Sequence, residues 1–354
     1  MTRFLFFGLF IVFIILMLAM DLGVFHKKDR VVGIKESAIW TSVWVLLSMA
    51  LAALIYFHAE WIHGIGSLEE LQAYAHGSDL ERQLQGISDY ATALDIYRHE
   101  MATQYLAGYF MEESLSVDNI FVMILIFASF GIPREYYHRV LFWGILGAIV
   151  LRFIFIFALG ALVNRFGWVL AVFGVILVYS GINMFKKKEE KIDTANHPVV
   201  KFCSRHFRAT PNLDGHKFFS RIDGKSFMTP LFIVLLVIEF SDIIFAVDSI
   251  PAVYGVTQDP EIVFFSNIFA VMGLRSLFFL MSDVADRFWL LQYGLGLLLT
   301  FIGAKMLLHQ FVPDFDITAM QGLFVILGIL IVSIVLSLVI KRPVSKDNGM
   351  HADA

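Results

Sequence analysis

The chain has 354 residues, of which 58% are hydrophobic and 16% charged, and its formal net charge is −4. Soluble domains carry about 25% charged residues, and disulfide-stabilised secreted domains need several cysteines, whereas this chain has one. The composition excludes both classes, and it also excludes a disordered chain. The apolar runs are continuous rather than alternating, which excludes a porin-like barrel and indicates a polytopic helical membrane protein.

Nine apolar stretches are each close to the ~20 residues that an α-helix needs to cross the hydrocarbon core. We therefore predict an all-α polytopic membrane protein with about nine transmembrane helices. The first stretch has no clear small-residue cleavage site after it, so we interpret it as an uncleaved helix and not as a signal peptide. The approximate spans are 4–20, 38–57, 105–130, 138–161, 166–185, 227–253, 261–282, 288–308 and 317–340.

The distribution of Lys and Arg predicts the orientation of these helices. Of the 27 basic residues, 20 fall on one side, four on the other and three inside spans. This bias places the N-terminus outside and the C-terminus in the cytoplasm, which requires an odd number of spans. Segment 58–104 is then an acidic outer segment, expected to form a helical pair or an interfacial segment. Loop 187–226 is basic and lies inside, where it serves orientation and attraction to anionic lipid; no nucleic-acid-binding module accompanies its charge.

The middle of the chain repeats itself. Leu151-Arg152 matches Leu274-Arg275 at an offset of 123, and Gly181-Ile182-Asn183-Met184 matches Gly303-Ala304-Lys305-Met306 at 122. Because each copy has three helices, the second copy enters the membrane from the opposite side, which gives an inverted repeat. The alternative is chance similarity among apolar helices. The chain then divides into two N-terminal helices (1–57), the outer segment (58–104), the first repeat (105–186), the basic loop (187–226), the second repeat (227–308), and the last helix with a cytoplasmic tail (309–354).

Each copy begins with carboxylates inside an apolar stretch. When Asp118 is laid on Asp248, Glu112 falls on Asp242, six positions earlier in both copies, and Glu239 is an additional acid. An ionised carboxylate at bilayer depth costs at least ~2.5–3.5 kcal/mol on insertion scales. Acids at matched positions therefore imply compensation by cations, by protons or by arginine.

Two arrangements would bring these acids to one ion. Residues six apart on an ideal helix are separated by ~120° and ~9 Å, so one intact helix does not aim both acids at the same point. Either two helices from opposed copies each contribute, or a break favoured by Pro251 brings the acids together. Asn119 and Ser249 would add neutral oxygen ligands. This oxygen-rich set suits Mn²⁺, Ca²⁺ or Mg²⁺, and the spans hold no cysteine and no paired histidine.

Three bases, Arg152, Arg275 and Lys305, lie inside spans, and we interpret them as structural ion-pair partners. In the alternative interpretation, buried ion pairs merely lock the bundle. Three bases cannot neutralise six carboxylates, a count that includes Glu113, so that account leaves charge for protons to cover. Histidines near span ends, His63 among them, are interpreted as interfacial.

The chain resembles the TerC/Alx family of integral membrane proteins, which belongs with the LysE-like transporters. The resemblance runs from about 20 to 310. It implies a site formed by Glu112, Asp118, Glu239, Asp242 and Asp248, and it carries an association with tellurite resistance and with Mn²⁺ export. The motifs that carry it are Asp21-Leu22-Gly23-Val24-Phe25, Glu113-Ser114-Leu115-Ser116-Val117-Asp118-Asn119, Glu239-Phe240-Ser241-Asp242 and Phe245-Ala246-Val247-Asp248-Ser249-Ile250-Pro251.

We therefore expect a multi-pass protein of the bacterial inner membrane that exports a divalent metal ion, in the first place Mn²⁺, by alternating access. The expected partners are the lipid bilayer and the transported metal ion, with a homo-oligomer or membrane protein partners left open. No tightly bound cofactor is expected, and the protein is not expected to be an enzyme, since it has no P-loop for ATP hydrolysis. The alternatives are an exporter of another cation such as Ca²⁺, and a non-transporting scaffold for metal delivery or tellurite stress that acts through the basic loop. Deletion of most of residues 190–222 should abolish the function of a scaffold and spare that of a transporter.

Overall fold

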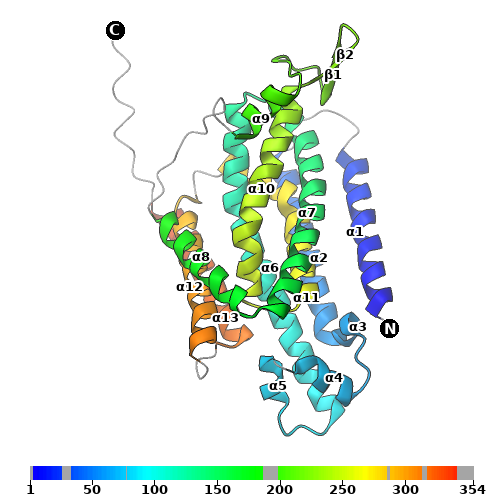
Figure 1. Ribbon diagram of the computed structural model, residues 1–354, viewed down its shortest axis with the longest axis vertical. Helices are drawn as coiled ribbons and strands as arrows, with labels where there is room; N and C mark the ends of the chain where they lie inside the picture. Colours follow the sequence, from blue (N-terminus) through cyan, green and yellow to red (C-terminus); the bar gives the residue numbers. More distant parts are fainter. Residues whose placement is uncertain are drawn as a thin grey trace.

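The computed structural model describes residues 3–25, 33–76, 78–185, 198–284, 288–312 and 317–340. Most of these residues form helices that run side by side in one elongated bundle (Figure 1). The helices are α1 (Arg3–Phe25), α2 (Ile34–His58), α3 (Glu60–His63), α4 (Leu68–Ala75), α5 (Asp79–Leu84), α6 (Tyr90–Ser129), the 3₁₀ turn η1 (Arg134–Tyr136), α7 (Tyr137–Arg165), α8 (Trp168–Met184), α9 (Pro198–His206), α10 (Pro230–Tyr254), α11 (Pro260–Val284), α12 (Leu291–Phe311) and α13 (Ala319–Val339).

Among the described residues, seven helices are long and apolar enough to cross a membrane: α1, α2, α7, α10, α11, α12 and α13. Helix α8 is apolar but has only 17 residues. Helix α6 has 40 residues, and Glu112, Glu113 and Asp118 fall within its apolar part. The prediction of a polytopic, helical membrane protein is therefore confirmed.

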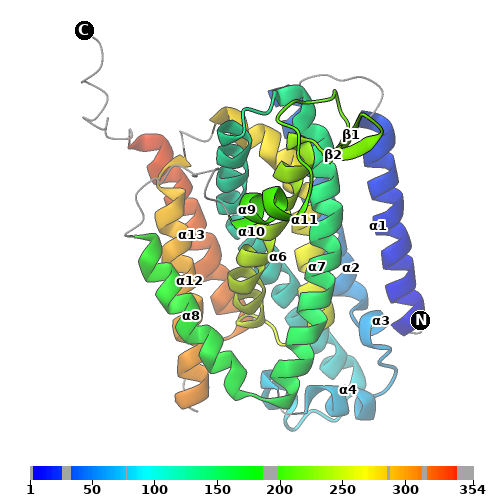
Figure 2. The same ribbon diagram turned by 45° about the horizontal axis from the view of Figure 1, so that its top comes forward.

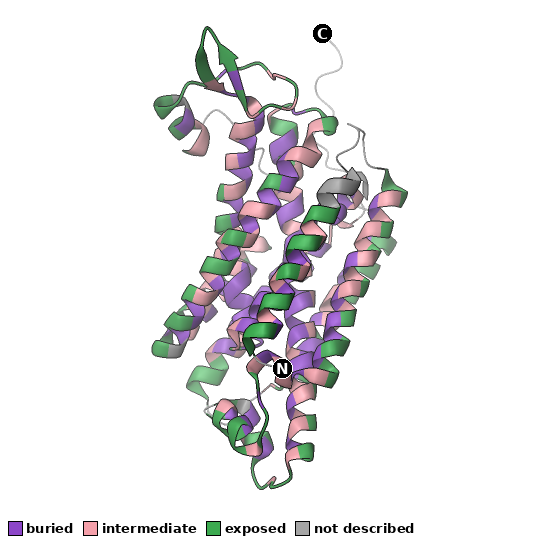
Figure 3. Ribbon diagram, turned by 90° about the vertical axis from the view of Figure 1, so that its right-hand side faces the viewer, coloured by how far each residue is buried: buried purple, intermediate pink, exposed green. Residues whose placement is uncertain are grey.

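The centre of the bundle is formed around α11. Residues 261–279 of this helix are all buried, and α11 packs against α2, α6 and α7. Phe265 and Phe269 of α11 pack against Phe10 of α1 with tilted rings, at centroid distances of 4.4 and 6.0 Å. Figure 3 shows the burial pattern, with buried residues facing the interior and exposed residues on the outer helix faces. Many of these exposed side chains are large and apolar, as in a protein whose outer surface meets lipid tails.

Segment 58–104 is helical, with α3, α4, α5 and the N-terminal part of α6, which begins at Tyr90 rather than near residue 105. We call this segment the cap; it lies at one end of the bundle (Figure 1). Arg98 of α6 donates to both carboxylate oxygens of Glu60 of α3, at 2.8 and 2.6 Å. The long α6 thereby joins the cap rigidly to the interior of the bundle.

The basic loop holds a small sheet that the sequence analysis did not predict. Strands β1 (Phe219–Ile222) and β2 (Lys225–Met228) pair in antiparallel fashion, with Phe219 opposite Met228. The two residues that join them, Asp223 and Gly224, have φ values of 50° and 75°. An Asp-Gly pair with positive φ at both positions is the usual two-residue turn of a hairpin. The dipeptide was therefore a usable signal in the sequence.

The cap lies at one end of the bundle and the β1–β2 hairpin at the other (Figure 2). Helix α1 begins at the cap end, where the Arg3 backbone lies beside Gly64. Helix α13 ends at the opposite end, which also holds the hairpin; there the Trp289 indole donates to the carbonyl oxygen of Ile340 at 3.1 Å. Helices α1 and α13 therefore both run from the cap end toward the hairpin end, so the start of α1 and the end of α13 lie at opposite ends of the molecule.

Candidate functional site

The Arg152 guanidinium of α7 is completely buried in the bundle, at 0% exposed. It donates to both carboxylate oxygens of Asp242 of α10, from Nη2 at 2.9 Å and from Nε at 3.3 Å. Its Nη1 donates to Oε1 of Glu112 of α6 and, at 3.1 Å, to Oδ1 of Asn267 of α11. One arginine therefore ties together four different helices in the interior.

The two acids at this arginine are the pair that the repeat predicts to be equivalent. Glu112 and Asp242 come from helices α6 and α10, and both are buried. Helix α10 continues without interruption from Pro230 to Tyr254, with Pro251 in its last turn. Of the two arrangements considered from the sequence, the structure therefore shows convergence of two helices rather than a break within one.

The other predicted acids lie around this centre and are half-buried. The carboxylate of Glu239 lies directly against Gly147 of α7, where a larger residue would collide with it. Asp248 accepts a hydrogen bond from the Ser180 hydroxyl of α8 at 3.2 Å. Glu113 and Asp118 follow Glu112 along α6.

Several buried polar atoms around the centre have no hydrogen-bond partner. They are Oε2 of Glu112, Oγ of Ser116, Nδ2 of Asn119, Oγ of Ser249 and Nδ2 of Asn267. Buried polar atoms without partners are uncommon in proteins and are costly away from water. Asn119 and Ser249, which the predicted repeat makes counterparts, are both among them, on α6 and α10.

The three predicted bases have different surroundings. Arg152 contacts Glu112 and Asp242. Arg275 of α11 is also buried, and its Nη1 lies 3.1 Å from Nε2 of His138 at the start of α7. The Lys305 ammonium nitrogen lies near Gly322 of α13. A Cβ atom added to this glycine would be 4.0 Å from that nitrogen.

The interior network does not form a metal cage in this arrangement. Within the ranges described above, no three His, Cys, Asp or Glu side chains are grouped so that they could hold a metal ion. Arg152 lies between Glu112 and Asp242, the two acids that the predicted repeat aligns. Asn267, which the sequence analysis did not predict, is a further hydrogen-bond acceptor of Arg152. Its signal in the sequence is a single amide side chain inside an apolar span.

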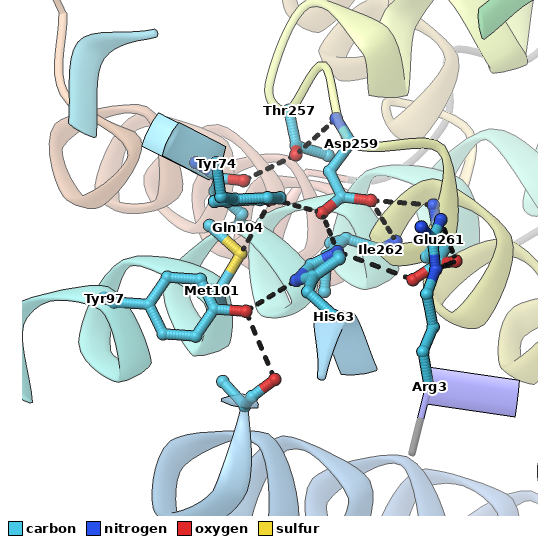
Figure 4. Close-up of polar contacts among 11 residues, drawn as sticks. Arg3, His63, Tyr74, Tyr97, Met101, Gln104, Thr257, Asp259, Glu261 and Ile262 are labelled. Atoms are coloured by element: carbon cyan, nitrogen blue, oxygen red, sulfur yellow. Dashed lines mark hydrogen bonds and ion pairs between the residues drawn. The ribbon is translucent and has the colours of Figure 1, made fainter. Parts of the chain in front are cut away.

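A second buried polar network lies at the cap end (Figure 4). Asp259, in the turn between α10 and α11, lies 2.7 Å from Nε2 of His63 of α3 and accepts from the Tyr74 hydroxyl at 2.5 Å. The backbone N–H groups of Glu261 and Ile262 also donate to it, at 2.8 and 3.3 Å. His63 is therefore a buried connection between the cap and the bundle, not the interfacial side chain that its position near a span end suggested.

Further contacts extend this cap network. Nδ1 of His63 lies 2.5 Å from the Tyr97 hydroxyl, and Arg3 of α1 makes a 2.6 Å ion pair with Glu261. Burial and the charge of Asp259 raise the pKa of Tyr97 and that of Tyr74 well above 10. Burial by itself raises the pKa of Asp259, but attraction to His63 and the hydrogen bonds from His63, Tyr74 and the Glu261 backbone lower it to about 2.

A cavity of about 1060 Å³ opens beside the cap network. Its lining comes from the cap and from the ends of the bundle helices, including Gln104 of α6, Leu170 of α8, Tyr254 of α10 and Met306 of α12. The cavity therefore extends from the cap toward helices of both proposed repeats.

Comparisons with known proteins place the chain in a family. The family described as "Integral membrane protein TerC family" matches residues 97–345. "Uncharacterized membrane protein STKORF319" of Myxococcus xanthus is 41% identical over 333 residues, which cover 94% of this chain and 92% of that protein. "Putative membrane-bound redox modulator Alx" of Escherichia coli (strain K12) is 36% identical over 343 residues, 97% of each chain. No solved structure matches. The chain therefore belongs to the TerC family of integral membrane proteins.

Proposed function

We propose that the protein exports divalent metal ions, Mn²⁺ first among them, by alternating access around the acids of two inverted repeats. The observation that carries this proposal is the meeting of Glu112 and Asp242 at Arg152. These acids occupy equivalent positions of the two copies and come from different helices. An inverted-repeat transporter has its site at such an interface.

The packing of α8 against α12 supports the repeat. Gly174 and Gly296 are counterparts, as are Gly181 and Gly303. A Cβ on Gly181 would lie 2.6 Å from the Gly296 carbonyl oxygen, and a Cβ on Gly303 would lie 2.6 Å from the Gly174 carbonyl oxygen. This crosswise pairing is what a two-fold axis between antiparallel counterparts produces, since it maps one contact onto the other.

Two further features agree with the same axis. Helix α7 begins at Tyr137 and α11 at Pro260, which is the 123-residue offset of the repeat. Helix α6 packs against α11, and its proposed counterpart α10 packs against α7. We count α6 and α8 as spans besides the seven helices named above, which agrees with the prediction of nine membrane crossings. The distribution of Lys and Arg then assigns the cap to the outside and the hairpin to the cytoplasm.

The charge of the centre suits a hard cation. Two carboxylates and one guanidinium carry a net charge of −1 when all are ionised, and Glu239 and Glu113 are close by in the chain. The unsatisfied oxygens of Glu112, Ser116 and Ser249 are the neutral and anionic donors that Mn²⁺ and Ca²⁺ prefer. Because Arg152 stands between Glu112 and Asp242, a metal ion binds these acids only after the guanidinium has moved.

The Alx relatives are named as redox modulators, which suggests a different activity. A dithiol–disulfide exchange within one chain needs two cysteines, and these 354 residues contain one, Cys203. That residue is buried in α9, outside the acid network. Metal transport therefore accounts for more of the structure than a thiol-based activity does.

The test is ion flux in proteoliposomes, with Mn²⁺, Ca²⁺, Mg²⁺ and Zn²⁺ compared, with and without a pH gradient. We expect Mn²⁺ flux by the parent protein and its loss in Asp118→Asn and Asp248→Asn, because each removes one matched carboxylate. A matched control is Glu81→Gln, whose side chain is half-exposed in the cap. Parent-level flux in either Asp variant would contradict the central site.

Substitutions in the basic loop distinguish a transporter from a scaffold. The loop includes α9, and the hairpin hydrogen-bonds back to Arg208 and Thr210. We therefore prefer Lys201→Glu with Arg205→Glu, on α9, to a deletion that would cut β1. A transporter keeps its metal flux in this variant. A non-transporting scaffold shows no flux even in the parent, and in cells its variant loses the function that the parent provides.

A further inference from the structure

Two buried arginines occupy equivalent positions of the proposed repeats. Arg152 on α7 and Arg275 on α11 are 123 residues apart, which is also the offset between the first residues of their helices. Both are almost completely buried, at 0% and 3% exposed. A two-fold arrangement would give both arginines the same neighbours.

Their actual neighbours differ. Arg152 reaches Glu112, Asp242 and Asn267 at the centre. Arg275 instead approaches His138, the second residue of α7, toward the hairpin end. The structure is therefore asymmetric at the point where the acids meet, and only one of two equivalent guanidinium groups is at the acid pair.

The repeat identifies the place that would receive Arg152 in the mirrored arrangement. The counterpart of His138 is Glu261, which is likewise the second residue of its helix. Glu261 is 7% exposed, and its Oε1 contacts Arg3. Its Oε2 is buried and accepts no hydrogen bond, with His63 Nε2 at 3.5 Å (Figure 4).

Asn267, which Arg152 contacts now, and Glu261 are six residues apart on α11, about 9 Å along the helix axis and about 120° around it. A change of the Arg152 rotamer therefore reaches Glu261 only together with a translation and rotation of α7 against α11. The space between Glu112 and Asp242 holds one guanidinium, so the arrival of Arg275 there requires the departure of Arg152.

We propose that Arg152 and Arg275 take turns at the Glu112–Asp242 pair, which refines the export function proposed above and rests on it. In the present arrangement Arg152 compensates the acids, and in the other arrangement Arg275 does so while Arg152 pairs with Glu261. The transported cation binds the acids between these states. Because of this exchange, the protein without bound cation has an arginine beside Glu112 and Asp242 in both states. Neither state then has the cost of buried carboxylates without a counter-charge.

The position of the cavity assigns the present arrangement to a state open at the cap end. Met306 of α12 lines this cavity. Its repeat counterpart is Met184, the last residue of α8, at the other end of the same helix pair. Cysteines at these two positions therefore report on opposite ends of the bundle, and neither residue belongs to the charge network.

The experiment measures the rate at which a water-soluble maleimide labels Met306→Cys or Met184→Cys in a Cys203→Ser background. Protein in lipid nanodiscs exposes both ends to the reagent, so the result does not depend on membrane orientation. Glu261→Gln removes the carboxylate that receives Arg152, and His138→Phe removes the ring nitrogen that holds Arg275. Arg275→Lys weakens the mirrored state, because a lysine cannot bridge two carboxylates as a guanidinium does.

Labelling of Met184→Cys should fall about tenfold or more with Glu261→Gln or Arg275→Lys and rise by a similar factor with His138→Phe, since a lost charge-assisted hydrogen bond shifts a two-state equilibrium by about that much. Labelling of Met306→Cys should move in the opposite direction. Arg3→Ala is the matched control, because it breaks the ion pair of Glu261 but keeps its charge; Met184→Cys labelling should stay constant or rise.

The exchange is overturned if the Glu261 and His138 variants shift labelling in the same direction, if neither shifts it, or if Arg3→Ala reproduces Glu261→Gln. Labelling requires no metal ion, so it is separable from the export function. Mn²⁺ flux in the parent without the expected labelling changes would remove the exchange and leave export standing. The expected changes without flux of any metal ion would leave the exchange standing and remove export.

Discussion

The central network and the cap network are both built from buried acids, yet their hydrogen bonding differs. Asp259 in the cap accepts from Tyr74 and from two backbone N–H groups and contacts His63. At the centre, one arginine is shared by two acids, and Oε2 of Glu112 has no partner. A buried carboxylate whose oxygens are all hydrogen-bonded is held in place, whereas unsatisfied groups suit rearrangement or a ligand. In the cap, Asp259 is of the first kind, and Oε2 of Glu261 beside it is the unsatisfied atom. The contacts of Asp259 are thus expected to persist while the centre changes.

The largest effect is expected from removal of the shared arginine. Arg152→Met leaves Glu112 and Asp242 buried without their counter-charge, which should destabilise the protein by about 3–5 kcal/mol. Thermal unfolding in detergent measures this loss. In the same background, Glu112→Gln and Asp242→Asn should recover most of it, because no buried charge then remains. A failure of recovery would show that Arg152 acts mainly through packing.

An intermediate effect is expected when the cap is acidified. The pKa of Asp259 is lowered from 3.8 to about 2, so its carboxylate stabilises the folded cap above pH 4 by about 2 kcal/mol. This contribution is fully present above the unfolded pKa and is lost as the pH falls from about 4 through 2. Hydrogen exchange of the α3 and α4 backbone should therefore accelerate over this range.

The Asp259→Asn variant provides the control for acidification. Its cap should already exchange faster at pH 6, and the acceleration between pH 4 and 2 should be much smaller than in the parent. An unchanged pH profile in this variant would assign the transition to a different group.

The smallest effect is expected at the rim of the cap. Glu60 and Arg98 form a two-fold hydrogen-bonded ion pair, and hydrogen bonding to Arg98 keeps the pKa of Glu60 low despite the opposing effect of burial. Because both groups are partly exposed, Glu60→Gln should cost below about 1 kcal/mol. The same thermal unfolding assay checks this value. A loss as large as that of Arg152→Met would remove the distinction between rim and centre.

Much of the bundle follows from the chain's apolar pattern. The apolar runs correspond to long helices. The offset of the predicted repeat also aligns Glu112 with Asp242, the two acids that bind Arg152. Sequence periodicity reports such features because it depends on residues within one helix or at a fixed offset. The Asp223-Gly224 turn is equally local, so the hairpin could have been predicted from this dipeptide.

The remaining features depend on contacts that no local pattern encodes. The repeat makes Arg152 and Arg275 equivalent, so it cannot tell which of them meets the acids. His63 and Asp259 are distant in the chain, and their contact exists only because the cap folds over the turn between α10 and α11. Asn267 is a single polar residue in an apolar helix, a pattern that also fits a residue at a helix interface.

The enclosure of α11 has a consequence for synthesis. This helix is surrounded by α2, α6 and α7, all of which leave the ribosome before it. It also carries Asn267 and Arg275, which are poorly suited to lipid. The partners that satisfy these side chains must therefore already be in the bilayer, and must part enough to admit a late segment. We infer that insertion of α11 is the step at which the nascent chain commits to its final packing.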